Sequence, residues 1–247
     1  MTVAPRAEKR YNDPWPGPAR WAIIGMKGRN PVKNQTKRIL ALAAGALFLV
    51  LILLVRKVDV AAIGPEGTQI GLSGINRAVH EGIGVNFSLY SISQWIGYAA
   101  LAAAACLAAA GLCQLIRRKS LMKVDRDILA LGALYAVTAA LYVFFEKFIV
   151  NYRPVIMPGE TYPEASFPSS HTMLFCVILG SAGILAVRHM KNNAGKAAAA
   201  LCWGLAIVGV ALRTASGVHW CTDIVAGLLI SAALLGWYSA ALMPKKE

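Results

Sequence analysis

A histidine and an aspartate stand four residues apart in the segment RTASGVHWCTD, at His219 and Asp223. If a helix begins near Val218, the two side chains lie on one face of it. A carboxylate that binds one imidazole nitrogen fixes the tautomer of the ring and leaves the other nitrogen free to attack an electrophile. The pair is therefore a candidate nucleophile, although His219 alone could be an interfacial histidine and Asp223 alone a helix N-cap.

Three basic residues belong to stretches that we expect on the same face of the protein. Lys147 and Arg153 lie in EKFIVNYRP, and Arg213 precedes the histidine by six residues. The planar fork of arginine matches phosphate oxygens in a bidentate way, so two arginines and a lysine suit a multiply charged anion. One basic side chain at a helix end could simply extend to the membrane surface. Three on one face indicate an anion site.

A polar cluster, FPSSHT, directly precedes a long apolar run. Ser169, Ser170 and His171 would open a helix, and the unpaired N–H groups of a helix N-terminus bind phosphate. The Ser169 hydroxyl could add a donor and His171 could protonate a leaving oxygen, although both serines could be caps and nothing more. Serine-hydrolase chemistry fits less well, because the chain has no GxSxG motif and that chemistry does not need three cations.

Together these residues provide an anion clamp, an oriented nucleophile and an acid, which is what phosphoryl transfer through a phosphohistidine requires. A divalent metal ion is disfavoured because three cations would repel it. The five cysteines form no CxxC pair and show no metal-ligand spacing. We therefore expect neither a metal nor another cofactor.

The composition places these residues in a membrane protein. Of the 247 residues, 57% are hydrophobic and 15% charged, whereas a soluble domain carries about 25% charged residues. The net charge of +13 would suggest nucleic acid in a soluble protein, but basic loops give membrane proteins the same balance. No nucleic-acid partner is expected.

Six segments are apolar and long enough to span a bilayer, which takes about 20 helical residues. With the N-terminus in the cytoplasm, nineteen of the 25 Lys and Arg residues fall on the cytoplasmic side, as the positive-inside rule requires. We expect a cytoplasmic tail (1–38), one membrane domain (39–247), a cytoplasmic C-terminus and an external loop (57–92) with an amphipathic piece around INRAVHEGI. The predicted spans are 39–56, about 93–116, 128–148, 169–187, 197–214 and 223–243.

The three polar stretches resemble the type 2 phosphatidic acid phosphatase superfamily, membrane lipid phosphatases related to vanadium haloperoxidases. That family carries Lys followed by Arg-Pro, then Pro-Ser-Gly-His, then Arg-x5-His-x3-Asp. Here they read KFIVNYRP, PSSH and RTASGVHWCTD, and the resemblance covers about residues 90 to 235. It implies an all-α bundle of six transmembrane helices with an extracytoplasmic active site and no metal.

The resemblance also implies a role for each residue. His219 would be the nucleophile, Asp223 its orienting partner and His171 the acid that protonates the leaving group. The phosphate ligands would be Lys147, Arg153, Ser169, the amide of Ser170, and Arg213.

Three positions depart from the family pattern. Five residues rather than six separate Lys147 from Arg153, so Glu146 occupies the usual lysine position. This change turns a helical side chain by about 100°, but Arg153 precedes a proline and is biased away from helix, so Lys147 can still reach the phosphate. Ser170 replaces a glycine of which only the backbone amide is needed, and Leu212 replaces a serine that often precedes the arginine.

The expected activity is hydrolysis of a lipid phosphate or diphosphate at the outer leaflet of the plasma membrane. Undecaprenyl diphosphate, phosphatidylglycerol phosphate and phosphatidate are the candidate substrates. A lipid phosphotransferase with an acceptor other than water would carry the same motifs, and a lipid-binding protein without catalysis could keep the fold. Glu160 and Glu164, in the loop before the serines, could shape headgroup choice or merely be solvated.

Overall fold

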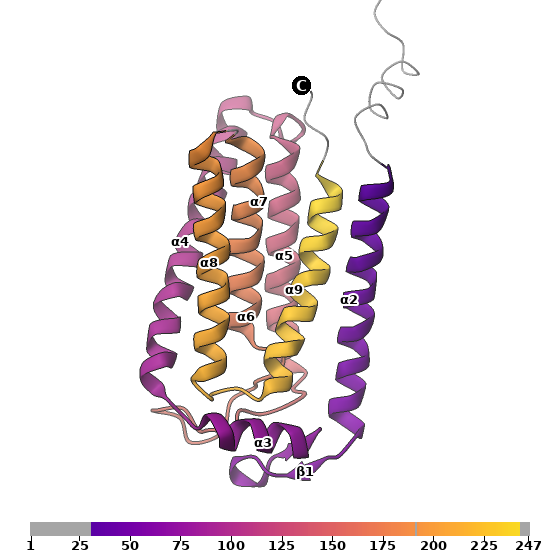
Figure 1. Ribbon diagram of the computed structural model, residues 1–247. Coiled ribbons are helices and arrows are strands. Elements are labelled where there is room, and N and C mark those ends of the chain that lie inside the picture. Colours follow the sequence, from indigo (N-terminus) through magenta and orange to yellow (C-terminus); the bar gives the residue numbers. More distant parts are fainter. Residues whose placement is uncertain (1–30, 191, 243–247) are drawn as a thin grey trace, which may run out of the picture.

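The computed structural model describes residues 31–190 and 192–242. Within them, six helical spans are long and apolar enough to cross a membrane, and they stand side by side as one bundle (Figure 1). The predicted all-α class and the number of spans are confirmed. The spans are α2 (Pro31–Lys57), α4 (Phe87–Arg118), α5 (Arg126–Lys147), a composite span from Ser170 to His189, α8 (Asn193–Ala215) and α9 (Cys221–Ala241).

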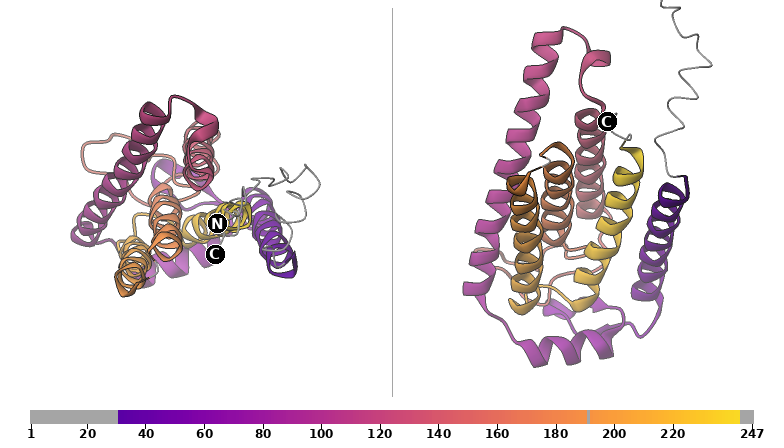
Figure 2. Two further views of the ribbon diagram at one scale, coloured as in Figure 1. Left: turned by 90° about the horizontal axis from the view of Figure 1, so that it is seen from above. Right: turned by 45° about the horizontal axis from the view of Figure 1, so that its top comes forward.

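The composite span is the centre of the bundle. It consists of α6 (Ser170–Leu174), the π-helical turn η3 (Phe175–Leu179) and α7 (Gly180–His189), and a larger share of it is buried than of any other span. It packs on α4, α8 and α9, and Figure 2 shows it between them in the view from above. π-helical turns often occur at functional sites, and this one follows directly on the helix that PSSH opens.

Helix α2 packs along α9 at the edge of the bundle. Small residues make the close approach possible, since Ala41 faces Gly236 and Gly45 faces Ala233, the type of contact that membrane helices favour. Farther along, Phe48 stacks at 6.1 Å on the loop residue Phe167. This contact joins α2 to the loop that precedes the PSSH motif.

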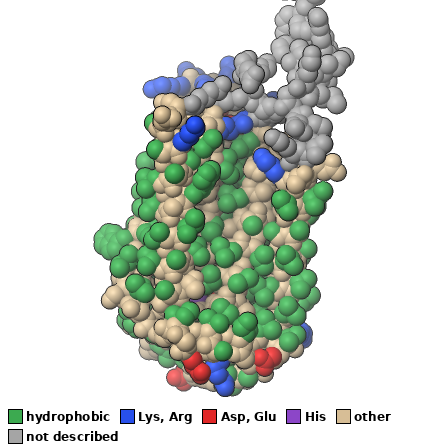
Figure 3. All heavy atoms as spheres, in the orientation of Figure 1, with side chains coloured by type: hydrophobic (Ala, Val, Ile, Leu, Met, Phe, Trp, Pro, Cys, Tyr) green, Lys and Arg blue, Asp and Glu red, His purple; other side chains and the backbone are tan. Residues whose placement is uncertain are grey.

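Apolar and charged side chains occupy different parts of the bundle surface. Hydrophobic side chains cover its long wall, Lys and Arg gather at the end where α9 ends, and Asp and Glu appear at the other end together with further basic side chains (Figure 3). The wall is the surface expected to face lipid. The assignment of the basic end to the cytoplasm stays a prediction of the positive-inside rule.

The predicted external loop folds across the end of the bundle opposite to the start of α2 (Figure 1). It contains a hairpin of β1 (Ala61–Ala62) and β2 (Gln69–Ile70) around the short helix η1 (Pro65–Gly67), then α3 (Ser73–Ile83), the expected amphipathic piece. The buried Asn76 ties α3 to α9, because its Oδ1 accepts from the Thr222 amide at 3.3 Å. The loop therefore holds the N-terminus of α9 in place.

Most helix boundaries differ from the predicted spans, and three of the differences have a bearing on the fold or the site. Helix α2 begins at Pro31, inside the segment assigned to the tail, since proline suits the first turn of a helix; the rest of that tail lies outside the described residues. Helix α4 begins at Phe87 because Asn86 caps it, accepting from the Leu89 amide at 3.0 Å. Helix α9 begins at Cys221 instead of near residue 218. A short helix, η2 (Leu121–Lys123), links α4 to α5.

Gly217 lies in the turn between α8 and α9 and has no room for a side chain. Its φ is +65°, and an added Cβ would lie 1.9 Å from the Gly84 carbonyl oxygen. We expect Gly217→Ala to lower the free energy of unfolding by about 1–3 kcal/mol, measured as a lower Tm in detergent. Gly204→Ala is the matched control, because that helical glycine has open space around it; equal Tm values for the two variants would contradict this account.

Candidate active site

Seven of the eight predicted site residues gather at one end of the bundle, where α3 lies. Arg153, Ser169, Arg213, His219 and Asp223 are buried there. His219 interacts electrostatically with three of the predicted residues, Arg153, Arg213 and His171. The other two members, Ser170 and His171, are the first two residues of α6. Distant helix ends thus bring together the residues that the sequence predicted as one site.

His219 and Asp223 lie close together, as their spacing predicts, but without a direct hydrogen bond between them. The His219 Nδ1 to Asp223 Oδ2 distance is 3.8 Å, and the hydroxyl of Ser166 lies between them. Ser166 Oγ is 2.8 Å from Nδ1 and donates to Oδ2 at 2.5 Å. Because the hydroxyl gives its proton to the carboxylate, its oxygen accepts the Nδ1–H of His219.

The start of α9 explains why the direct hydrogen bond is absent. His219 precedes the helix, so it does not share a helical face with Asp223. The Asp223 carboxylate instead caps the helix, with Oδ2 accepting from the Trp220 amide at 3.0 Å and Oδ1 from Asn151 Nδ2 at 3.4 Å. A helix from residue 218 would place the two side chains on one face; with the later start, they are joined through the Ser166 hydroxyl.

The opposite nitrogen of His219 faces a cation. Arg153 Nη1 lies 3.3 Å from Nε2, and it also donates to the Val218 carbonyl at 3.4 Å. Burial lowers the pKa of His219 well below its ordinary 6.5, and the charge of Arg153 lowers it further. The ring is therefore neutral at pH 7, with its proton on Nδ1 and a lone pair on Nε2, which is the form that attacks electrophiles.

Arg213 has hydrogen-bond donors without protein partners. Its guanidinium is fully buried, donates from Nη2 to Gln94 Oε1 at 3.0 Å and lies 4.6 Å over the ring of Tyr90. Within the described part of the chain, its Nε and Nη1 have no hydrogen-bond partner, and neither does Nδ1 of His171. Buried polar groups are nearly always paired, so these groups are free to bind a ligand.

Ser169 is the N-cap of α6, which is one of the two roles that the sequence indicated for it. Its Oγ accepts from the Thr172 amide at 3.4 Å and from the Thr172 hydroxyl at 3.1 Å, which leaves its own proton free to donate. Its amide donates to the Asp223 carbonyl at 3.0 Å, so the start of α6 is tied to the start of α9. Ser170 is the first residue of α6, where backbone N–H groups lack helical partners.

Comparison with known proteins decides the family. The family model described as PAP2 superfamily matches residues 41–246. The chain belongs to the PAP2 superfamily. Among solved structures, the first transmembrane PAP2 type phosphatidylglycerolphosphate phosphatase from Bacillus subtilis is similar, with a TM-score of 0.58 and 17% identity over 81% of this chain and 94% of that one. At this identity the likeness concerns the fold. No curated protein matched the chain.

The PAP2 membership confirms the resemblance inferred from the three motifs. With its six apolar spans, the chain is an integral membrane protein of a lipid phosphatase family. The histidines, arginines and serines that gather at one end of the bundle are therefore the candidate PAP2 site. Ser166 joins them as a member for which the motifs gave no role.

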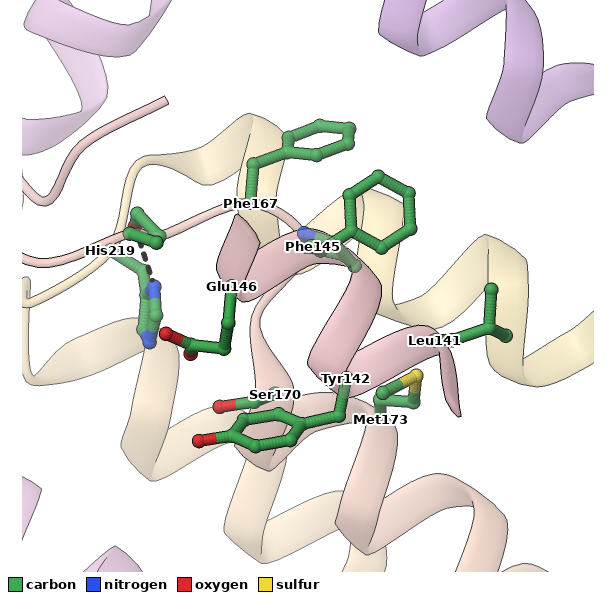
Figure 4. A pocket seen from close by; sticks show the side chains of 11 residues that line it. Leu141, Tyr142, Phe145, Glu146, Phe167, Ser170, Met173 and His219 are labelled. Atoms are coloured by element: carbon green, nitrogen blue, oxygen red, sulfur yellow. Dashed lines mark hydrogen bonds between the residues drawn. The ribbon is translucent and has the colours of Figure 1, made fainter. Parts of the chain in front are cut away.

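The remaining predicted residue of the PAP2 motifs, Lys147, stands at the same end of the bundle but is not part of this group. It is the last residue of α5, is exposed, and does not line the cavity beside His219. Glu146 lines that cavity instead, with its carboxylate turned toward His219 and the hydroxyls of Tyr142 and Ser170 nearby (Figure 4). Because α5 remains helical through Lys147, the rotation of about 100° between neighbours is kept. A phosphate contact by Lys147 stays a prediction that this placement does not support.

Proposed function

We propose that this PAP2 protein hydrolyses a lipid phosphate or diphosphate through a phosphohistidine on His219, with water as the acceptor and without a metal ion. The observation that carries the proposal is the fully buried Arg213 with two unpaired N–H groups. Arg213 interacts electrostatically with His219. The free nitrogen of that histidine, Nε2, already faces a second arginine, Arg153. Two converging guanidinium groups beside a neutral imidazole suit a phosphoryl group about to be transferred.

In the first step, the Nε2 lone pair of His219 attacks phosphorus, and the bond from phosphorus to the leaving oxygen breaks. His171 donates a proton to that oxygen. Asp223, acting through Ser166, stabilises the positive charge that develops on the imidazole ring. The phosphoryl oxygens are held by the two arginines together with the N-terminus of α6.

In the second step, water attacks the phosphorus of the phosphohistidine. His171, now neutral, takes a proton from the water, the bond from phosphorus to Nε2 breaks, and phosphate leaves. The free hydroxyl proton of Ser169 supplies one further donor to the phosphoryl group. The ring of His219 returns to the neutral form with its proton on Nδ1.

A groove beside the site suits a lipid tail. It lies between α2, α5 and α9, has a volume of about 780 Å³ and is lined mainly by apolar side chains. It shares Leu141 and Phe145 with the small cavity that contains His219, so a tail in the groove brings its headgroup toward the histidine. We place this site at the extracytoplasmic side, on the charge distribution alone.

Phosphate release from lipid phosphates tests the proposal. Purified protein in detergent with a chelator is expected to release phosphate from at least one of phosphatidylglycerol phosphate, phosphatidate and undecaprenyl diphosphate. The first is the starting choice, because the similar Bacillus subtilis protein is a phosphatidylglycerolphosphate phosphatase. Vanadate is expected to inhibit, since it adopts the five-coordinate geometry of the transferring group, and isotope from labelled water is expected in the released phosphate.

Three outcomes would contradict parts of the proposal. No release from any of these lipids would contradict the phosphatase. Loss of activity under chelator would contradict metal independence. Release without label from water would indicate transfer to another acceptor.

A further inference from the structure

Helix α4 contains none of the three motifs, yet one face of it lies against the candidate site. It packs along α8, whose last turn contains Arg213 (Figure 1). Tyr90, Gln94 and Gly97 of α4 have the spacing of one helical face. Tyr90 and Gln94 both contact the Arg213 guanidinium. An added Cβ at Gly97 would lie 3.5 Å from Cδ2 of His171. This face of α4 therefore borders the site from a part of the chain to which the motifs gave no role.

Arg213 is a buried cation that is held by neutral groups. Its guanidinium is fully buried, and the like charge of Arg153 is close enough to act on it. Among the described residues, no carboxylate forms an ion pair with Arg213. Its Nη2 donates instead to Gln94 Oε1 at 3.0 Å, and its Cζ lies 4.6 Å from the centre of the Tyr90 ring. An amide oxygen and the face of an aromatic ring both attract a cation.

Neutral partners leave the charge of Arg213 available to a ligand. A carboxylate in the place of the amide would offset most of that charge, as Glu164 does for the neighbouring Arg153, whose Nε is 3.0 Å from it. The amide of Gln94 occupies Nη2 alone, and Nε and Nη1 have no partner in the described part of the chain. These two groups are the ones that the proposed phosphate would bind.

The main chain of Arg213 is also tied to the start of α4. The Asn86 amide donates to the Ser216 carbonyl at 3.0 Å, and the Ser216 hydroxyl donates to the Arg213 carbonyl at 2.7 Å. Both the side chain and the backbone of the arginine are thus connected to the first turns of α4. A guanidinium that is already fixed loses less conformational freedom when it binds an anion, so this arrangement favours tight binding of phosphate.

Resting on the proposed phosphatase activity, we propose that Gln94 is a positioning residue for Arg213, with the Tyr90 ring as the second contact. Gln94 Oε1 holds Nη2, so that Nε and Nη1 stay directed to the phosphoryl oxygens, and Gln94 does not bind the phosphate itself. Loss of this contact weakens the binding of the transferring phosphoryl group, and it does so through Arg213.

Vanadate inhibition tests the positioning role on the full-length protein. Gln94→Met keeps the length of the side chain and removes the acceptor, so kcat/KM is expected to fall about 20-fold, the effect of one hydrogen bond to a charged group. The inhibition constant of vanadate should rise by the same factor, because vanadate occupies the phosphoryl site. A variant that was merely less well folded would lose active molecules and keep the wild-type inhibition constant. Tyr90→Leu, which removes the ring, should change both quantities about fivefold.

Gln114→Met is the matched control, because Gln114 lies on the same helix at its other end. There its Nε2 donates to Asp125 Oδ2 at 2.8 Å, so the variant should have a lower Tm and the wild-type inhibition constant. An unchanged inhibition constant in Gln94→Met would overturn the inference.

An Arg213→Met background shows whether Gln94 acts through the arginine. With the guanidinium gone, Gln94→Met should lower kcat/KM for a nitrophenyl phosphate by less than about twofold further. A further loss of about 20-fold would overturn the positioning role, since Gln94 would then bind the phosphate directly.

A binding measurement separates this inference from the activity on which it rests. Vanadate should raise the Tm of the wild-type protein, since a ligand of the folded state stabilises it with or without turnover, and Gln94→Met should need about 20-fold more vanadate for the same rise. An equal rise at equal vanadate in both proteins would overturn the positioning role. Absence of phosphate release from every lipid phosphate, with a rise in Tm that depends on Gln94, would contradict the phosphatase and support the positioning of Arg213.

Discussion

His219→Ala protein is expected to lose at least about 10⁴-fold in kcat, because the variant lacks the nitrogen on which the proposed covalent intermediate forms. His171→Ala is expected to behave differently. It removes the proton donor to the leaving oxygen, so hydrolysis of an alkyl phosphate should fall while a nitrophenyl phosphate, whose leaving group needs no proton, keeps a substantial rate. Steady-state kinetics with the two esters measure this separation directly.

Trapping of the intermediate completes the experiment. Rapid quenching of wild-type protein should yield an acid-labile phosphoenzyme, and His219→Ala should yield none. Near-normal Tm values for both variants would show that the loss is chemical. A His219→Ala enzyme with near-normal rates would contradict the nucleophile assignment, and an equal loss on both esters in His171→Ala would contradict its role as the acid.

The six spans could be predicted from the sequence because the bilayer leaves few choices. A segment of about 20 apolar residues in lipid must satisfy its backbone hydrogen bonds internally, and a helix does so. Because successive spans cross the membrane in opposite directions, the three motifs lie at the same end of the bundle. Arg153, Arg213 and His219 could therefore be grouped from the sequence alone. The helix boundaries do not follow from hydropathy in the same way, because local caps such as Asn86 determine them.

Ser166 could not be predicted in the same way. It stands in an irregular loop, where no periodicity relates sequence to direction. Its position depends on pairing between parts of that loop, with its amide donating to the Asn151 carbonyl at 2.9 Å and a bridge between Tyr152 and Ala165. The same limit applies to Lys147 and Glu146. The proline after Arg153 predicts a non-helical backbone that would let Lys147 reach the phosphate. In the structure, α5 stays helical through Lys147, and Glu146 lines the cavity instead.

The bridging role of Ser166 predicts a large loss when its hydroxyl is removed. Ser166→Ala would leave the Nδ1–H of His219 and the Asp223 carboxylate without the group that joins them, so kcat is expected to fall about 10²-fold, and Asp223→Asn about 10³-fold or more, as for other oriented histidines. Ser166→Thr keeps the hydroxyl and should restore part of the rate. Ser91→Ala removes an exposed serine hydroxyl on α4 and should leave kcat unchanged.

The pH profile distinguishes orientation from a change in basicity. Burial and then Arg153 hold the pKa of His219 well below 6.5, so the ring is neutral at higher pH and the acid limb of kcat/KM that it produces lies below that value. Ser166 accepts the Nδ1–H and thereby favours the protonated ring; its removal lowers the pKa further and cannot move the limb upward. The loss in Ser166→Ala should therefore be the same from about pH 7 to 9. Recovery of the wild-type rate at high pH would mean that Ser166 acts on the protonation of His219 and not on its orientation.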